Sequence, residues 1–417
     1  MKASKLAGIA VSTSLIAGLV LTGCGSASSG SDSGKTAITF WAPFSGPDGP
    51  FMKSLVDKYD KSQSKYDVKL QIVPQNDYYK TVDLAFNGQK TRPDLLIMHL
   101  DQIPTYVSKG LLQPVDQLAQ KAGITKDDYA KASWNYDTFN GKLYAMPLDI
   151  HPLIMYYNKD LFKAAGITNP PTNRQEFLDD VKKLTVPSKG QYGYVVPTLW
   201  PQQFIFPTIL FQNGGQLMDN QGHIAYNSKA GVEALQFMKS LIDKHYSPAN
   251  VQQDGEITLF LQGKNAIDLN GPWMKDQWDK AHINYGVAPV PQLGTVKQAV
   301  FGNGHNFVVP KAETDKTKLA GIADFLKFAT ANSIDWAKSG QAVASNKVRA
   351  TEAFKKLTQQ PIVAKEFDYV QFSPKVANWG SISDPLWKEI NMALLGQKSP
   401  QQALDDAAKE SRQAMGK

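Results

Sequence analysis

The fold class follows from residues 36–73, which read TAITFWAPFSGPDGPFMKSLVDKYDKSQSKYDVKLQIV. Residues 37–41 form a short β-rich run, and a loop rich in Pro and Gly follows it. In residues 51–59 the apolar positions recur every three or four residues, which predicts a helix. Residues 68–73 predict a second strand, and residues 94–98 a third that is apolar without alternation, as in a parallel strand covered on both faces. This βαβ pattern predicts an α/β fold with a mostly parallel sheet wrapped by helices.

Later segments continue the alternation of strands and helices. Asn173 and Glu176 have the spacing of a helix N-terminal capping signal. The apolar residues at 307–309 predict a strand. Four further helices are expected from spacing and end signals, at residues 174–184, 230–242, 319–329 and 384–395.

Composition excludes several classes of protein. The 417 residues are 42% hydrophobic and 20% charged, which is enough apolar material for a large core and too much for a disordered chain. The net charge of +7 is spread along the chain, so we expect no nucleic acid as a partner. A single Cys excludes an internal disulfide and a thiolate metal cluster.

The N-terminus has the features of an export signal. Two lysines precede an apolar run at residues 6–21, which is short for a membrane span of about 20 residues. The run ends in Leu21-Thr22-Gly23-Cys24, which resembles a bacterial lipobox. This resemblance implies a lipoprotein signal peptide at residues 1–23 and lipidation of Cys24. Residues 24–35 are then the lipidated Cys and a flexible, Ser- and Gly-rich tether. The alternative is an ordinary signal with a chance Cys.

Motifs for catalysis and cofactors are mostly absent. The sequence has no Gly-x-Ser-x-Gly, no His-Glu-x-x-His, no phosphate loop and no Gly-x-Gly-x-x-Gly after a strand. The nearest approach to a dinucleotide loop, at residues 302–304, leads into a predicted strand where a helix is required. The six His show no metal-ligand spacing on one element. We therefore expect no cofactor, no metal and no enzyme, although paired carboxylates of a hydrolase come together only in the fold.

A series of short motifs resembles one family. They occur in order from about Thr36 to the C-terminus, at residues 93–96 with Asp101, 141–147, 157–162, 165–166, 170–172, 270–273 and 284–287. In these motifs the chain resembles the sugar-binding proteins of ABC importers, within the family 1 extracellular solute-binding proteins, and most of all the maltose/maltodextrin-binding group.

The resemblance implies a two-lobed fold of the type II periplasmic-binding-protein kind, with a ligand cleft between lobes that close by a hinge. Each lobe is expected to be discontinuous, with lobe 1 at 36–150 plus 302–343 and lobe 2 at 151–301 plus 344–417. The chain is expected to cross between lobes near residues 149–151, 301–303 and 340–344.

Aromatic residues at strand ends and in loops are the expected stacking surfaces for sugar rings, whose C–H faces pack on aromatic side chains. For Trp41 the alternative is a core ring at the sheet edge. The resemblance places Trp273, which follows Gly-Pro at a strand end, against a sugar ring. The expected stacking residues are Trp41, Phe44, Trp200, Phe204, Trp273 and Trp379, the last just before the helix at 384–395.

Polar candidates supply the donors and acceptors that sugar hydroxyls need. Asp101 matches an acid of the maltodextrin-binding relatives; the alternative is a helix N-cap. His151 stands where those relatives carry a glutamate, which puts maltose specificity in doubt; the alternative is a structural His. Asp149 is a candidate that could equally be a turn residue. Gln202 is a further candidate. Asn303 either approaches ligand or forms a tight turn with positive φ.

These inferences predict a lipid-anchored, monomeric receptor on the outer face of a bacterial membrane, of a style that suits a Gram-positive envelope. It would bind a carbohydrate, expected to be an oligosaccharide, and deliver it to an ABC permease with its transmembrane subunits and ATPase. The rivals are a glycerol-3-phosphate receptor, a secreted glycoside hydrolase and a surface adhesin. A phosphate dianion favours clustered Arg, and no Arg motif lies beside the candidate residues.

Overall fold

The computed structural model describes residues 34–88 and 92–416. Residues Thr36–Lys417 form one compact unit. The predicted signal peptide, Cys24 and most of the predicted tether lie outside the described residues. Within the described ranges, no helix has the length and apolarity that a membrane crossing requires.

The first sheet contains strands from residues 36–73, the segment that predicts the fold class. Its strand order is β2-β1-β3-β13-β6, and β1 runs parallel to both β2 and β3. The three predicted strands at the N-terminus are therefore confirmed. The bounds of the sheet are β1 Thr36–Ala42, β2 Tyr66–Ile72, β3 Leu95–His99, β13 His305–Val308 and β6 Met146–Pro147.

The expectation of a mostly parallel sheet is only half right. β13 pairs antiparallel with β3 and with β6. β13 does not reach the sheet through a helical crossover from β3; it enters directly after β12 (Val300–Asn303), and this direct entry allows the opposite direction.

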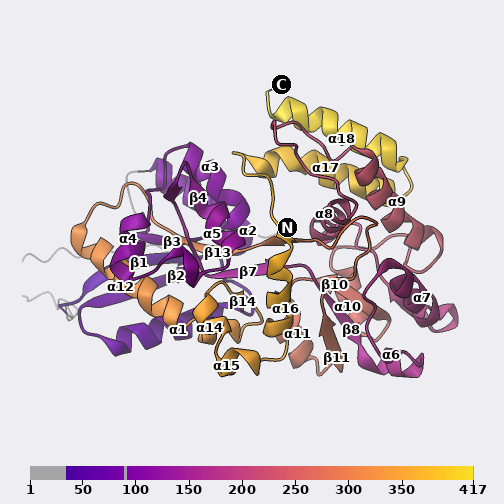
Figure 1. The fold of residues 1–417 in the computed structure, drawn as a ribbon, viewed down its shortest axis with the longest axis horizontal. Helices are drawn as coiled ribbons and strands as arrows, with labels where there is room; N and C mark the ends of the chain where they lie inside the picture. Colours follow the sequence, from indigo (N-terminus) through magenta and orange to yellow (C-terminus); the bar gives the residue numbers. More distant parts are fainter. Residues whose placement is uncertain (1–33, 89–91, 417) are drawn as a thin grey trace, which may run out of the picture. The chain divides into compact units, whose positions relative to one another are not determined.

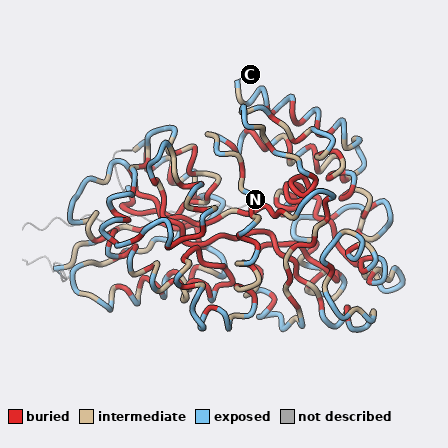
Figure 2. The backbone as a smooth tube through the Cα atoms, viewed as in Figure 1, coloured by how far each residue is buried: buried red, intermediate tan, exposed pale blue. Residues whose placement is uncertain are grey.

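Helices cover both faces of the first sheet. Phe40 of β1 packs against Phe307 of β13 and Phe325 of α12 (Lys316–Ala331), each with ring centroids 5.8 Å apart. On the other face, α2 (Gln75–Asn87) places the Tyr78 hydroxyl as donor to the backbone oxygens of Trp41 and Ile97. The central strands β3 and β13 are therefore buried between layers, whereas the edge strand β2 is partly exposed. The red backbone in the interior of Figure 2 shows where such buried segments lie.

The second sheet has the strand order β11-β8-β10-β9, with β8 antiparallel to β10 and β11. The helix predicted at 174–184 is confirmed as α7, and Asn173 accepts a hydrogen bond from the Glu176 backbone N–H as its cap. The bounds are β8 Ile154–Asn158, β9 Tyr192–Tyr194, β10 Asn265–Asn270, β11 Tyr285–Ala288, α7 Arg174–Leu184, α8 Gln202–Gln212 and α9 Lys229–Asp243.

A third, small sheet contains the three segments expected to cross between lobes. Its order is β14-β7-β12-β15, and in Figure 1 β7 runs between the first sheet on the left and the second sheet on the right. Glycines allow close packing here: a Cβ on Gly304 would lie 2.7 Å from the Asp149 backbone oxygen. The bounds are β7 Asp149–Pro152, β14 Ala342–Val343 and β15 Val370–Gln371.

The C-terminal helices differ from the expectation in one respect. The helix predicted at 384–395 is α17 and begins at Trp379, so Trp379 opens this helix and does not precede it. Asp384-Pro385 is typical of a helix start, yet Pro385 lies inside α17, and a further helix, α18 (Pro400–Ala414), follows.

The remaining elements are short, apart from α1, which confirms the helix expected at 51–59. They are α1 Gly49–Ser62, η1 Leu100–Gln102, α3 Ile103–Ser108, α4 Asp116–Ala122, η2 Lys126–Asp128, α5 Lys131–Asp137, β4 Thr138–Phe139, β5 Lys142–Leu143, α6 Lys159–Ala164, η3 Pro187–Lys189, α10 Gly255–Leu261, η4 Pro272–Met274, α11 Lys275–Lys280, α13 Ile334–Ala337, α14 Asn346–Arg349, α15 Glu352–Lys355, α16 Gln360–Lys365 and η5 Glu366–Asp368.

Candidate functional site

A buried carboxylate organises the junction between the first sheet and the small sheet. Asp149 of β7 has no exposed surface and accepts four hydrogen bonds. The donors are His151 Nδ1 at 3.0 Å, His305 Nδ1 at 2.8 Å, the His305 backbone N–H at 3.1 Å and Trp336 Nε1 at 2.7 Å. Asp149 is therefore not a turn residue, and it connects three separate segments of the chain.

The charges of this network follow from burial and pairing. Burial alone would raise the pKa of Asp149, but the charge of His305 and hydrogen bonds from both His side chains lower it below its usual value. Burial alone would lower the pKa of His305, yet attraction to Asp149 raises it. Burial and repulsion from His305 lower the pKa of His151. Pairing and burial thus favour an Asp149–His305 ion pair beside a neutral His151.

A third imidazole completes a cluster that the sequence did not reveal. His99, at the end of β3, lies directly opposite His305 across the β3/β13 pair. Its ring centroid is 4.8 Å from that of His305, and the His305 ring is 4.5 Å from that of His151. The Tyr79 hydroxyl lies 2.7 Å from His99 Nδ1.

Three aromatic side chains lie beside this cluster, and one of them, Trp273, contacts it. Trp273 and Trp200 are stacked with centroids 6.2 Å apart and an interplanar angle of 29°. Phe204 of α8 meets the Trp273 ring edge-on at 5.8 Å. Trp273 is half-buried and also contacts the His151 ring, at 5.6 Å. Three predicted stacking residues therefore come together beside a predicted polar one.

The local sequence explains the position of Trp273. A Cβ on Gly271 would lie 2.1 Å from the indole ring, so the ring folds back over a residue that must be Gly. Pro272 begins the short helix η4 directly after the strand. The Gly-Pro-Trp motif thus places a large aromatic ring at the end of β10.

A second polar contact joins the two candidate amide and carboxylate side chains. Asn303 Nδ2 donates to Asp101 Oδ1 at 2.9 Å. Asp101 does not act as an N-cap side chain for either η1 or α3. Asn303 lies in β12 and is absent from the described residues with positive φ, so the tight-turn alternative is wrong. Both residues are partly exposed.

The other candidates are more buried. Phe44 contacts the rings of His305 and Trp336, at 4.9 Å and 4.7 Å. Trp41 is 4% exposed and belongs to an apolar cluster of the first sheet, apart from Trp273. Gln202 is 2% exposed, and its side-chain N–H donates to the Trp387 backbone oxygen. Trp379 is 4% exposed at the start of α17.

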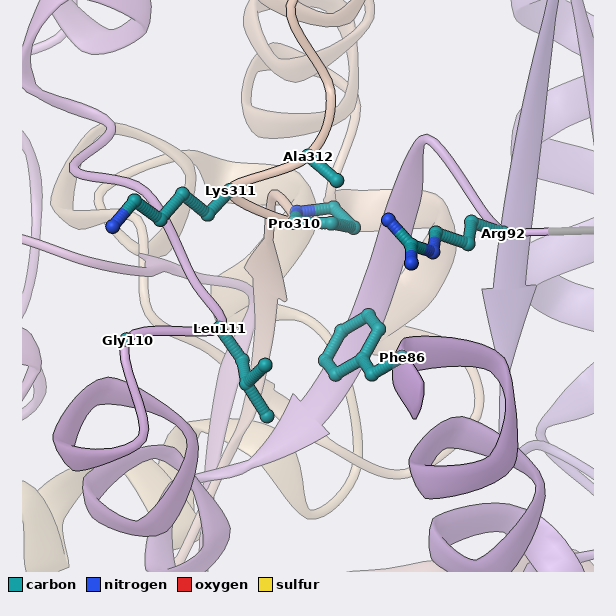
Figure 3. A pocket seen from close by; sticks show the side chains of 7 residues that line it. All are labelled: Phe86, Arg92, Gly110, Leu111, Pro310, Lys311 and Ala312. Carbon is teal, nitrogen blue, oxygen red and sulfur yellow. The ribbon is translucent and has the colours of Figure 1, made fainter. Parts of the chain in front are cut away.

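Two pockets of the described chain lie elsewhere. One, of about 290 Å³, is seen in Figure 3, where Phe86, Leu111 and Pro310 gather and Lys311 extends away. The other, of about 440 Å³, is lined in part by Gly214–Met218 and by Lys375. None of the predicted site residues lines either pocket. The candidate site instead consists of the contacting side chains of Asp149, His151, Trp200, Phe204 and Trp273.

Comparison with known proteins identifies the family. Residues 44–335 match the model of the family described as bacterial extracellular solute-binding protein. The chain belongs to this family. A maltooligosaccharide ABC transporter solute-binding lipoprotein of Streptococcus pneumoniae is 27% identical over 415 residues, 95% of this solute-binding protein and 94% of the relative. A galactooligosaccharide-binding protein of Bacillus subtilis is 26% identical, covering 94% of each chain.

Solved structures share the fold. An ABC substrate-binding protein from Listeria monocytogenes in complex with cycloalternan superimposes with a TM-score of 0.79 at 24% identity, over 92% of this solute-binding protein and 99% of that chain. The GacH receptor of Streptomyces glaucescens gives a TM-score of 0.80 at 23% identity, over 91% and 98%. The predicted α/β fold of two-lobed periplasmic binding proteins is thus confirmed for this solute-binding protein.

Sequence reasoning missed several members of the site in this solute-binding protein. His99 and Tyr79 were not among the candidates, and the apolar pattern around Trp336 is typical of a core residue. Trp336 is fully buried, but its indole N–H donates a hydrogen bond to Asp149. His99 directly follows a predicted strand, close to Asp101, and His305 follows Gly304, which Asn303 precedes. The positions that made Asp101 and Asn303 candidates therefore also indicate these two His residues.

Proposed function

We propose that this protein captures a carbohydrate, in particular an oligosaccharide, and delivers it to an ABC permease through contacts with the transmembrane subunits. The observation that supports this most is the stacked pair of Trp200 and Trp273 with Phe204 at its edge. Pyranose rings bind on such indole faces through their C–H groups. The relatives named for oligosaccharide transport and binding support the same substrate class.

Polar side chains near the rings would orient the sugar. Asp101 and Asn303 are partly exposed and offer carboxylate and amide groups to hydroxyls. His151 adds an imidazole against the Trp273 ring. Because an imidazole both donates and accepts where a carboxylate only accepts, we expect a hydroxyl pattern different from that of maltose. No bond of the ligand is broken in this proposal.

Ligand entry would require the two halves to separate. Ring contacts run without interruption from Trp200 through Trp273 and His151 to His305, and this leaves no room for a sugar between them. We infer that the lobes, at 36–150 plus 302–343 and 151–301 plus 344–417, rotate about the small sheet formed by β7, β12 and β14. Such hinge closure is the motion of periplasmic binding proteins.

The N-terminal region gives the proposed location. The family is extracellular, and lipid on Cys24 would hold the protein on the outer face of the membrane. Two or more acyl chains make such anchoring stable. A lipoprotein relative from a Gram-positive bacterium supports the same arrangement.

Calorimetry against a panel of oligosaccharides and glycerol phosphates tests the proposal. We expect one site per chain for an oligosaccharide; a Kd near 1 μM corresponds to about −8.2 kcal/mol. Trp273→Ala should weaken binding at least about tenfold, or 1.4 kcal/mol. Trp134→Ala is the matched control, because Trp134 of α5 is also half-buried but packs against Tyr129, with ring centroids 5.7 Å apart.

Other outcomes would favour the rivals. Binding of glycerol phosphate alone would favour that receptor class, and release of reducing ends would favour a hydrolase. Sugar binding without a change in radius of gyration would favour an adhesin. An isotherm unchanged by Trp273→Ala would remove the stacked pair from the site.

A further inference from the structure

Three imidazoles from distant parts of the chain converge at the junction of the first and small sheets. One nitrogen from each of His99, His151 and His305 lies within 4.8 Å of one nitrogen of the other two. His99 and His305 are partners across an antiparallel strand pair, where side chains of directly opposed residues share one face. His151 comes from β7, which pairs with the neighbouring strand β12.

Hydrogen bonds fix the orientation of all three rings through the same atom. Nδ1 of His151 and Nδ1 of His305 donate to the two oxygens of Asp149. His99 Nδ1 contacts the Tyr79 hydroxyl, which also accepts from the His99 backbone N–H. A neutral ring whose Nδ1 donates carries its lone pair on Nε2. His305, which is paired with Asp149 as an imidazolium, must therefore release its second proton before it can bind a metal ion. This arrangement of ring, second nitrogen and carboxylate is the usual support of metal-binding His.

We propose that His99, His151 and His305 bind a divalent first-row transition-metal ion, such as Zn²⁺, through one ring nitrogen each. Imidazole suits such ions, and three protein ligands leave a fourth position for water or a hydroxyl group. This inference rests on the His cluster and not on the stacked Trp pair. His151 belongs to both proposals, so the variants that test the metal site are made at His99 and His305.

The geometry requires only a small adjustment. Three nitrogens bound tetrahedrally at about 2.0–2.1 Å lie about 3.3 Å apart, so the cluster must tighten by roughly 1–1.5 Å. Rotation of the three side chains has to supply this movement. The buried Asp149 carboxylate also offsets part of the charge of a divalent cation.

The test uses metal alone and the chain from residue 24 onward with Cys24→Ser, so that no thiol competes. After treatment with a chelator, we expect one Zn²⁺ per chain with a Kd of about 1 μM or lower, and visible d–d absorption on addition of Co²⁺. His99→Ala and His305→Ala should each weaken Zn²⁺ binding at least tenfold. His223→Ala is the control, because His223 pairs with Asp219 on the surface and its loss should change nothing.

Each outcome decides the inference. Failure of the unmutated chain to bind Zn²⁺ at 100 μM, or binding that is unaffected by both cluster variants, would overturn it. If circular dichroism shows that a variant does not fold, X-ray absorption of the Zn²⁺-loaded unmutated chain decides instead. Three imidazole nitrogens around zinc support the site, and fewer than three refute it. Sugar binding can persist in either case, so failure here is distinguishable from failure of the proposed function.

Discussion

Replacing Asp149 by Asn tests whether this carboxylate holds the junction together. Each oxygen of Asp149 accepts from two donors: Oδ1 from His151 Nδ1 and the His305 backbone, and Oδ2 from His305 Nδ1 and Trp336 Nε1. An Asn side chain must turn its NH₂ group toward one of these pairs. His151 can change tautomer and accept, but the backbone N–H and the indole N–H cannot. At least one buried donor therefore faces another donor in either orientation.

The expected loss of stability follows from these contacts. An unsatisfied buried donor costs about 1–3 kcal/mol, and breaking a buried ion pair costs about 3–5 kcal/mol in total. Unfolding entropy is about 2.1 cal/mol/K per residue. For Thr36–Lys417 this gives an unfolding entropy of about 0.8 kcal/mol/K. Dividing the total loss of about 3–5 kcal/mol by this entropy predicts that Tm falls by about 4–6 °C if the unit melts as one transition.

Differential scanning calorimetry of chelator-treated protein measures this shift, and Asp219→Asn is the matched control. Asp219 also pairs with a His, at 3.0 Å between His223 Nδ1 and Oδ2, but its side chain is 40% exposed. Exposed pairs contribute about 0–1 kcal/mol, so the control should shift Tm by about 1 °C or less. If Asp149→Asn shifts Tm no more than the control, the network does not stabilise the junction and the reasoning fails.

Two further substitutions test other parts of the structure. Gly271→Ala should displace the Trp273 ring, which lies 2.1 Å from the new Cβ position, and should weaken oligosaccharide binding nearly as much as Trp273→Ala; wild-type affinity by calorimetry would contradict this. Burial raises the pKa of Asp268 to about 7 and that of Glu256 to about 8. The folded chain therefore retains protons on these carboxyl groups that the unfolded chain loses above about pH 4. Because the folded state binds more protons, the free energy of unfolding falls as the pH rises toward 8. Asp268→Asn should remove about 1.4 kcal/mol per pH unit of this slope between about pH 4.5 and 7 in urea unfolding; an unchanged slope would show that Asp268 is ionised in the folded chain.

Local sequence predicts the elements of this fold well because their signals lie within single segments. The strand at 94–98 reads as a buried run, and β3 is buried from Leu95 to Met98. The Asn173 and Glu176 pair identified the start of α7, where the cap bond forms. Trp273 is placed by two neighbours, Gly271 and Pro272. Each of these features needs only residues close in sequence.

The His cluster could not be predicted in this way. His99 and His305 become neighbours only because β13 returns to the first sheet and pairs with β3 in one register. A shift of that register by one residue would turn one of the two side chains to the opposite face. Spacing on a single element therefore contains no information about the cluster. The burial of Trp41 likewise depends on α2 covering the sheet, as in the hydrogen bond from Tyr78.

Several residues of the candidate site lie in the strands of the proposed hinge, so ligand binding would be coupled to closure of the lobes. Asp149 and His151 lie in β7, and Asn303 in β12, which pairs with it. Gly304 packs so closely against the Asp149 backbone that the two segments must move together. Rotation of the proposed lobes about this sheet would therefore change the distances from Asp101 and Asn303, which both belong to lobe 1, to the Trp273 ring in lobe 2. A ligand that contacts both halves gains these interactions only in the closed arrangement, and its differential affinity for the two arrangements sets how far closure proceeds.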